Sequence, residues 1–198
     1  MPAYHSSFNE EPDTRQVGNV AILPIKTRIR GPAPLGEMPS FPPFSNGELT
    51  SKPADPERAD ILDETIDLFR ANSLFRNFEI KGPADRILII LILYISDCLA
   101  KIGSARTVPT QIEAGKMLNT LSVDNFSIPG DAGFPLNAHY APPASRADAD
   151  YLRQYLTQVR QELAARLVER LYADGTGKPS KWWMSFQKRR FMNRSLGS

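Results

Sequence analysis

The segment from Ile87 to Ile95 is the strongest constraint on how this chain can fold. It reads Ile-Leu-Ile-Ile-Leu-Ile-Leu-Tyr-Ile and has no polar side, whereas a helix at a protein surface keeps one polar face. Its β-branched residues would also suit a buried strand. The flanking residues extend the segment to Ala84–Ile102, which is much longer than a typical strand of about 5–6 residues. We therefore predict a helix that is covered on every side.

The rest of the sequence predicts further helices, so the expected fold class is all-α. A helix without a polar side must be surrounded, and we expect several helices wrapped around this central one. Apolar residues at helical spacing, with capping or breaking residues at either end, indicate the others. The fold is expected to have about five helices: one that begins near Asp55–Pro56, then Ala84–Ile102, Thr110–Leu121, Arg146–Tyr172 and Lys181 to about Arg194.

Proline is concentrated in the first quarter of the chain. Ten of the seventeen prolines lie within residues 1–56, and proline fixes φ and removes a backbone donor. We therefore expect residues 1–55 to form an extended, proline-rich arm outside the packed bundle, and residues 56–198 to form a helical domain. The apolar residues of the arm leave two possibilities open: part of the arm packs on a neighbour or on its own domain, or the arm is mobile. The candidate contact residues in the arm are Ile25, Lys26 and Arg28.

The last part of the chain, residues 175–198, is both cationic and aromatic, and we refer to it as the tail. It holds six Lys/Arg, no acidic residue, two tryptophans and two phenylalanines. Because the chain has 24 basic and 22 acidic residues, the tail carries a net charge of +6 and residues 1–174 carry −4. Large aromatic side chains dominate interface energetics, so the tail is expected to contact something. The candidate contact or tail-packing residues are Trp182, Trp183, Phe186, Lys188, Arg189, Arg190 and Phe191.

The residues of the tail allow several interpretations. Cations beside aromatic rings are typical of proteins that bind single-stranded nucleic acid, although the rest of the chain is net acidic and no sheet with stacking aromatics is apparent. Tryptophan and arginine are also enriched at protein–protein hot spots, and an amphipathic helix can dock in a groove of a partner. Alternatively, Trp182 and Phe186 complete the core of the chain itself while the cations stay in solvent. A helix that lies on a membrane surface is a further alternative.

No residues of the sequence converge on a catalytic or metal site. His5 lies in the arm and His139 in a proline-rich loop. The single cysteine, Cys98, lies in the most apolar segment, where a buried and inert thiol is expected, and one cysteine gives no zinc-site spacing. Gly175-Thr-Gly-Lys178 lacks the glycine spacing and the Ser/Thr after lysine that a phosphate loop requires. The chain is therefore predicted not to be an enzyme and to need no cofactor.

The sequence also predicts a soluble, cytosolic protein. Its longest apolar run, Ile87 to Ile95, has nine residues, far fewer than the roughly 20 that span a bilayer. The amino terminus lacks the basic and apolar regions of a secretory signal.

Three long segments carry a resemblance to a known family, in the same order along the chain. They are the amino-terminal pieces Met1–Ser7, Gly18–Ile25 and Gly31–Pro34, then Phe126–Pro142, and then the tail pieces Lys178–Trp183 and Phe191–Leu196. Together they resemble the family of subunit 3, the 21-kilodalton subunit, of the actin-related protein 2/3 complex. The segment Leu35–Pro56 departs from that family, because it is longer and richer in proline than expected there.

The resemblance implies a non-catalytic subunit of a seven-subunit cytoplasmic complex that nucleates branched actin filaments. It implies the same arrangement of helices around a central one. It also implies contact with the actin-related protein 3 subunit, contact with the actin filament directly or indirectly, and binding of neither nucleic acid nor membrane. Actin-like proteins are acidic, so a tail of charge +6 would steer association with them. The alternative function is that of a basic-tailed, nucleic-acid-binding helical protein.

Overall fold

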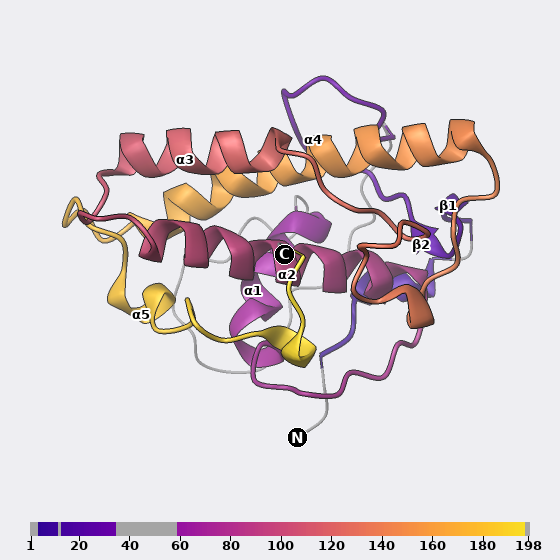
Figure 1. Ribbon diagram of the computed structural model, residues 1–198, viewed down its shortest axis with the longest axis horizontal. Helices are drawn as coiled ribbons and strands as arrows, with labels where there is room; N and C mark the ends of the chain where they lie inside the picture. Colours follow the sequence, from indigo (N-terminus) through magenta and orange to yellow (C-terminus); the bar gives the residue numbers. More distant parts are fainter. Residues whose placement is uncertain (1–3, 12, 35–58, 197–198) are drawn as a thin grey trace.

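The fold is mostly helical and centres on α2, Pro83–Gly103 (Figure 1). The computed structural model describes residues 4–11, 13–34 and 59–196. Within these residues the α-helices are five, as expected, and a two-stranded sheet accompanies them. The other helices are α1 (Ile61–Asn72), α3 (Gln111–Val123), α4 (Arg146–Leu171) and α5 (Lys181–Met184), the strands are β1 (Gln16–Val17) and β2 (Val20–Ala21), and the 3-10 turns are η1 (Ser7–Glu10), η3 (Asn137–His139) and η4 (Phe191–Asn193).

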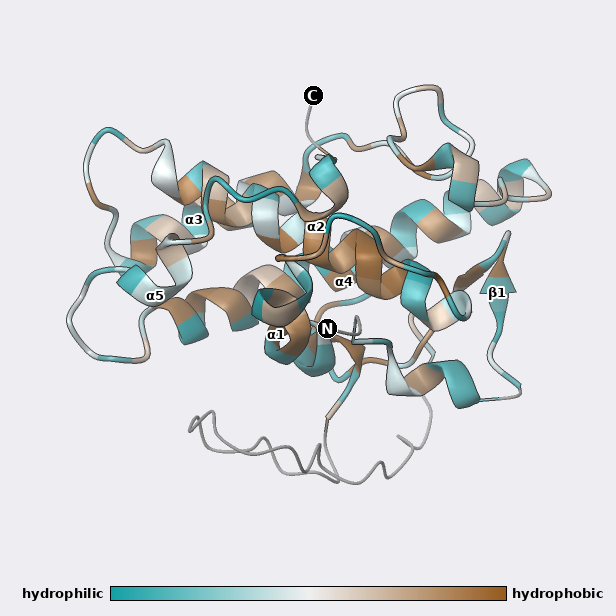
Figure 2. Ribbon diagram, turned by 90° about the horizontal axis from the view of Figure 1, so that it is seen from below, coloured by the Kyte–Doolittle hydropathy of each residue, from teal (hydrophilic) through white to brown (hydrophobic). Residues whose placement is uncertain are grey.

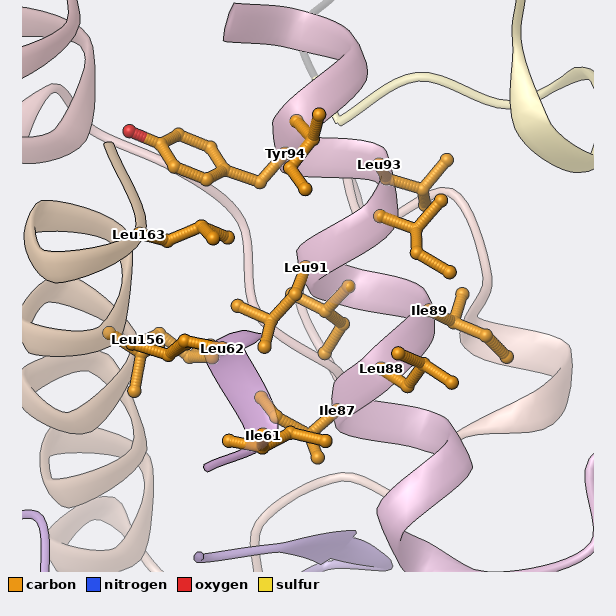
Figure 3. Close-up of a cluster of buried hydrophobic side chains, with 14 of the residues drawn as sticks. Ile61, Leu62, Ile87, Leu88, Ile89, Leu91, Leu93, Tyr94, Leu156 and Leu163 are labelled. Atoms are coloured by element: carbon orange, nitrogen blue, oxygen red, sulfur yellow. The ribbon is translucent and has the colours of Figure 1, made fainter. Parts of the chain in front are cut away.

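The central part of α2 is buried on all of its sides. Every residue from Ile87 to Ile95 is at most 3% exposed, and α2 contacts α1, α3, α4, α5, β2, η1 and η4. Figure 3 shows Leu91 of α2 facing α1 and α4, whereas Leu93 points away from them and is buried on the other side. In Figure 2 brown residues dominate the middle of the fold, and teal residues lie mainly towards its outside. Among the described residues, no helix has both the length and the apolarity that a membrane span needs.

The first helix begins later than the sequence suggested. We expected a start near Asp55–Pro56, and these two residues lie outside the described part of the chain, but α1 begins at Ile61. The Asp60 carboxylate accepts hydrogen bonds from the backbone N–H of Leu62 at 2.9 Å and of Asp63 at 3.1 Å. The Asp63 side chain accepts from the Asp60 backbone N–H in return. This reciprocal capping box satisfies donors that a helix leaves free at its start, and it therefore determines where α1 begins.

The described part of the arm, residues 4–34 except 12, belongs to the packed core and does not stand outside it. Val17, Val20 and Leu23 are at most 3% exposed, and β1 pairs with β2 in an antiparallel hairpin. The Tyr155 hydroxyl of α4 accepts from the Leu23 N–H at 3.0 Å and donates to the Leu23 carbonyl at 2.9 Å. Proline prevents a long helix here but not burial of the apolar residues between the prolines. The expected boundary at residues 55 and 56 lies outside the described residues.

The start of the chain is held by buried carboxylates of α1 and α2. Asp85 of α2 accepts from the Ser6 backbone N–H and lies 2.8 Å from His5 Nδ1. Glu64 of α1 accepts from both the backbone N–H and the hydroxyl of Ser7. Because burial disfavours the charged form, it raises the pKa of Glu64 above its ordinary value. Residues 4–11 thus attach to the helices through side chains, with no strand pairing.

A buried ion pair joins the arm, α1 and α4. The Arg166 guanidinium of α4 binds both oxygens of Asp60, at 2.7 and 2.9 Å, and Asp60 is completely buried. Arg166 also binds Glu162 at 2.9 Å and donates to the Lys26 carbonyl. Asp60 in turn accepts from the Lys26 backbone N–H at 2.9 Å. A buried pair of this kind tolerates the loss of one partner poorly, because the remaining charge stays desolvated.

Asp60→Ala is expected to destabilise the chain by about 2–4 kcal/mol, because it removes the cap of α1 and the two charged hydrogen bonds to Arg166. The measurement is urea unfolding of the isolated chain, followed by far-UV circular dichroism. Asp67→Ala on the same helix is the control, since the side chain of Asp67 is 57% exposed and lies 3.8 Å from Arg170; a change below ~0.5 kcal/mol is expected there. Equal effects of the two substitutions would contradict the role of Asp60.

Glu64→Gln is expected to stabilise the chain at neutral pH, because it removes a charge that burial disfavours. Since the pKa of Glu64 in the folded chain is raised, the unfavourable contribution is complete at high pH and disappears as the pH falls through the folded-state and then the unfolded-state pKa. The advantage of the variant over the wild-type chain should therefore shrink on acidification. Unfolding free energies of both chains between pH 5 and 8 test this, and a difference that does not change with pH would refute it.

Candidate docking surface

The tail crosses the carboxyl-terminal ends of α1 and α2 as a series of short turns. Figure 1 shows it in yellow, running past α1 and back toward α2. The helix expected from Lys181 to about Arg194 is wrong beyond its first turn, because α5 ends at Met184. Met192 and Asn193, with φ of 52° and 54°, have left-handed backbone conformations that no helix contains. The chain bends here, and the bend lets Phe191 pack into the core. A straight helix from Lys181 would place Phe191 beyond the core.

Two of the candidate aromatic residues are buried in the chain's own core. Trp183 is 7% exposed and stacks on Phe69 of α1 with ring centroids 5.8 Å apart. Phe191 is completely buried and meets Phe78 edge-on at 5.7 Å. Phe186 is half-buried and also packs edge-on against Phe69, at 6.0 Å. These rings attach the tail to α1 and to the segment that follows it.

Trp182 differs from its neighbour, because 58% of it is exposed. The guanidinium of Arg70, in the last turn of α1, lies over the rings of both tryptophans, 4.8 Å from that of Trp182 and 5.3 Å from that of Trp183. Arg70 is half-buried, and burial lowers its pKa below the ordinary value. Cation–π contacts of this kind contribute roughly 0.5–1 kcal/mol at exposed sites. The pair presents a partly desolvated cation and a flat aromatic surface side by side.

The basic residues of the tail face solvent. Lys188, Arg189 and Arg190 are all exposed, and none of them forms an ion pair with a residue that the structure describes. The Arg189 guanidinium lies over the Phe186 ring at 5.7 Å. The tail therefore combines aromatic residues that face inward with cations that face outward, and its unpaired positive charge is available to a partner.

The candidate residues of the arm lie elsewhere. Ile25 is 6% exposed and belongs to the core, whereas Lys26 and Arg28 are exposed. This part of the arm follows α4, as the hydrogen bond from the Thr27 hydroxyl to Glu162 shows. It contacts Asp60, the N-cap of α1, whereas the tail contacts the carboxyl-terminal end of the same helix. The length of α1 separates the two sets by about 18 Å, so the structure does not bring them together.

Sequence reasoning missed two residues of the tail's surroundings. Arg70 gave no signal, because a cation in the last turn of a helix is ordinary. Leu74 lies two residues after the end of α1 and is 57% exposed, but a single exposed leucine is common and attracts no attention. Only contact with the tail distinguishes Arg70, and that contact spans more than a hundred residues of sequence.

The two histidines and the cysteine do not form a catalytic or metal-binding arrangement among the described residues. His5 is paired with buried Asp85, and His139 is exposed. Cys98 is completely buried, as predicted, and burial raises the pKa of its thiol to about 12. No group of His, Cys, Asp and Glu in the described ranges is arranged to hold a metal ion.

Comparison with known proteins identifies the family. Residues 1–196 match the family described as P21-Arc, the ARP2/3 complex ARPC3 (21 kDa) subunit. The chain is 53% identical over 196 residues to actin-related protein 2/3 complex subunit 3 of Schizosaccharomyces pombe, covering 99% of this chain and 100% of the relative. The subunits 3 of Saccharomyces cerevisiae, at 48% over 200 residues, and Dictyostelium discoideum, at 46% over 194 residues, match 99% and 98% of this chain and 100% and 99% of their own lengths. The chain belongs to this family.

Family membership decides several of the expectations. The ARPC3 subunit is a non-catalytic component of the Arp2/3 complex, which nucleates branched actin filaments in the cytoplasmic actin cytoskeleton, and its partners are the other subunits of that complex. The resemblance seen in the sequence is therefore confirmed. The proline-rich segment Leu35–Pro56, where we expected a departure from the family, lies outside the described residues.

The two tryptophans of the tail should differ strongly in how much their replacement by alanine lowers the free energy of unfolding. Trp183→Ala is expected to cost about 3–5 kcal/mol, because it leaves a cavity beside Phe69. Trp182→Ala is expected to cost about 0.5–1 kcal/mol, which is the contact with Arg70 alone. Unfolding of the two variants in urea measures both values. If Trp182→Ala lowered the free energy of unfolding as much as Trp183→Ala does, this would contradict the exposure of Trp182.

Proposed function

We propose that this chain acts as a scaffold subunit that contacts the actin-related protein 3 subunit through the exposed side of its tail. We refer to Trp182, Lys188, Arg189 and Arg190 as the tail surface. The single observation that carries the proposal concerns its three cations: they are exposed and lack ion pairs to described residues. One of them, Arg189, lies over Phe186, which packs on Phe69 of α1.

The physical argument starts from the rigidity of this surface. Trp183 and Phe191 fix the tail on the core from within, so binding needs little ordering of the tail beyond its side chains, and that lowers the entropic cost of association. Arginine and tryptophan are the residues that most often carry interface energy. A net charge of +6 in residues 175–198 is complementary to an acidic, actin-like partner and would speed their encounter.

The scaffold role follows from the same contacts. A subunit that binds the assembled arrangement of its neighbours better than the separated one shifts the equilibrium toward assembly. By this mechanism the chain would favour the arrangement of the complex that is able to nucleate a filament. Lys26 and Arg28, which are exposed beside α4, are proposed as a second and smaller contact on another side of the molecule.

Charge reversal of the tail surface tests this function. The triple variant Lys188→Glu, Arg189→Glu, Arg190→Glu should incorporate into the complex at least about tenfold less well than the wild-type chain, because it places like charges against an acidic partner. Incorporation is measured by purifying the complex through a tag on another subunit and quantifying this chain in it. The isolated variant should remain helical by circular dichroism.

The control is a second triple reversal on exposed positions outside the tail, Arg15→Glu, Lys116→Glu and Arg146→Glu, which should incorporate normally. A photo-crosslinking residue at position 189 tests the partner, because the crosslink should join this chain to the actin-related protein 3 subunit. A crosslink to a different subunit would reject that partner. Normal incorporation of the tail variant, or nucleic acid that co-purifies with the wild-type chain and not with the tail variant, would reject the function.

A further inference from the structure

Arg70 is half-buried, and one of its buried N–H groups has no hydrogen-bond partner. Its Nη1 atom is inaccessible to solvent and makes no hydrogen bond to any described residue. The neighbouring acid on α1, Asp67, pairs with Arg170 at 3.8 Å, and no carboxylate of the described ranges forms an ion pair with Arg70. Unsatisfied buried donors are rare and costly, so this one requires an explanation.

The surroundings hold the guanidinium in place but do not satisfy it. Trp182 and Trp183 lie against it at 4.8 and 5.3 Å, and aromatic faces attract the cation without using its N–H donors. Since burial also lowers the pKa of Arg70, the site stores an unfavourable desolvation that an arriving anion would relieve. Arginine binds carboxylates through two parallel hydrogen bonds, and its planar fork suits such a partner.

Apart from Asp67, whose charge favours the protonated form of Arg70 without forming an ion pair with it, the side chains that lie against Arg70 are aromatic. Trp182 and Leu74 are 58% and 57% exposed, and Leu74 follows Arg70 by four residues at the end of α1. Phe186 and Arg189 continue the same layer, because Trp183 and Phe186 both pack on Phe69 and Arg189 lies over Phe186. The tail passes the end of α1 again where Met192 donates its backbone N–H to the Phe75 carbonyl. A partner that fits must therefore bring both an anion and apolar surface.

We propose that Arg70 binds an Asp or Glu carboxylate on a neighbouring subunit of the complex, and that an apolar side chain next to this carboxylate packs on Trp182 and Leu74. The inference rests on the proposed function, because it specifies the partner chemistry for the same face of the tail. The charge balance supports a protein partner with acidic residues: the tail itself supplies six cations and no acid. The exposed leucine and tryptophan favour a protein side chain over a bare phosphate group.

The test is a competition between two copies of this chain within the intact complex. Wild-type and variant chains with different tags are co-expressed with the other subunits, the complex is purified through a tag on one of those subunits, and the ratio of the two tags is measured. Arg70→Gln should reduce incorporation about 30-fold, which corresponds to the ~2 kcal/mol of a hot-spot residue. Arg76→Gln, which changes an exposed arginine six residues away, should compete equally with the wild-type chain.

Trp182→Ala provides a second variant, because its exposed ring can be removed with little effect on folding, and it should also reduce incorporation. If Arg70→Gln failed to fold by circular dichroism, the outcome for Trp182→Ala would decide. Incorporation of Arg70→Gln or, in that case, of Trp182→Ala within twofold of Arg76→Gln would overturn the inference. If the charge-reversed tail surface failed to incorporate while a folded Arg70→Gln chain competed normally, the proposed function would stand and the carboxylate site would be rejected. The carboxylate site would also be rejected if Arg70→Gln incorporated normally but lost nucleic acid that co-purifies with the wild-type chain.

Discussion

The need to cover α2 on all sides governs the rest of the structure. Burial of apolar surface is the dominant favourable term in the free energy of folding. Every residue of α2 from Ile87 to Ile95 is buried, so each would lose this favourable contribution if it faced water. The four other α-helices do not enclose α2 by themselves, because β2, η1 and η4 contact it as well. The hairpin of the arm therefore lies against one part of α2, and the turns of the tail lie against another. Segments without regular structure are thus as much a part of the core as the helices.

This covering role explains how the tail acquires its surface. Trp183, Phe186 and Phe191 are drawn inward against Phe69 and Phe78, where their burial stabilises the fold. The cations between them cannot follow, because a buried lysine or arginine would need a partner, and they remain exposed. The inward side of this short segment therefore contributes to folding, and its outward side is the one that we propose for docking. Arg70 is the exception, since it belongs to α1 but is partly covered by the tail's two tryptophans.

The polar interactions hold the irregular segments in place where apolar packing alone would not. Asp60 caps α1, binds Arg166 and accepts from Lys26, so one carboxylate joins the arm to two helices. Asp85 and Glu64 do the same for residues 4–11. The sequence could not reveal these roles, because Asp60, Asp85 and Glu64 resemble ordinary acids near helix starts. Each becomes informative only when its buried partner, distant along the chain, is known.

The sequence by itself determined the helical class, the extents of α2, α3 and α4 to within two residues, the burial of Cys98 and the family. These features depend on local periodicity, on capping residues and on the order of long segments, all of which are visible in one dimension. Tertiary structure alone decided the inclusion of the arm in the core, the end of α5 at Met184 and the separate environments of Trp182 and Trp183. In each case a long-range contact outweighed a local preference: Tyr155 with Leu23, Phe78 with Phe191, and Phe69 with Trp183. The start of α1 at Ile61 depends on both levels, because Asp60 is a local cap that Arg166 also binds. Adjacent tryptophans look equivalent in a sequence, but only one side of a single helical turn can face the core.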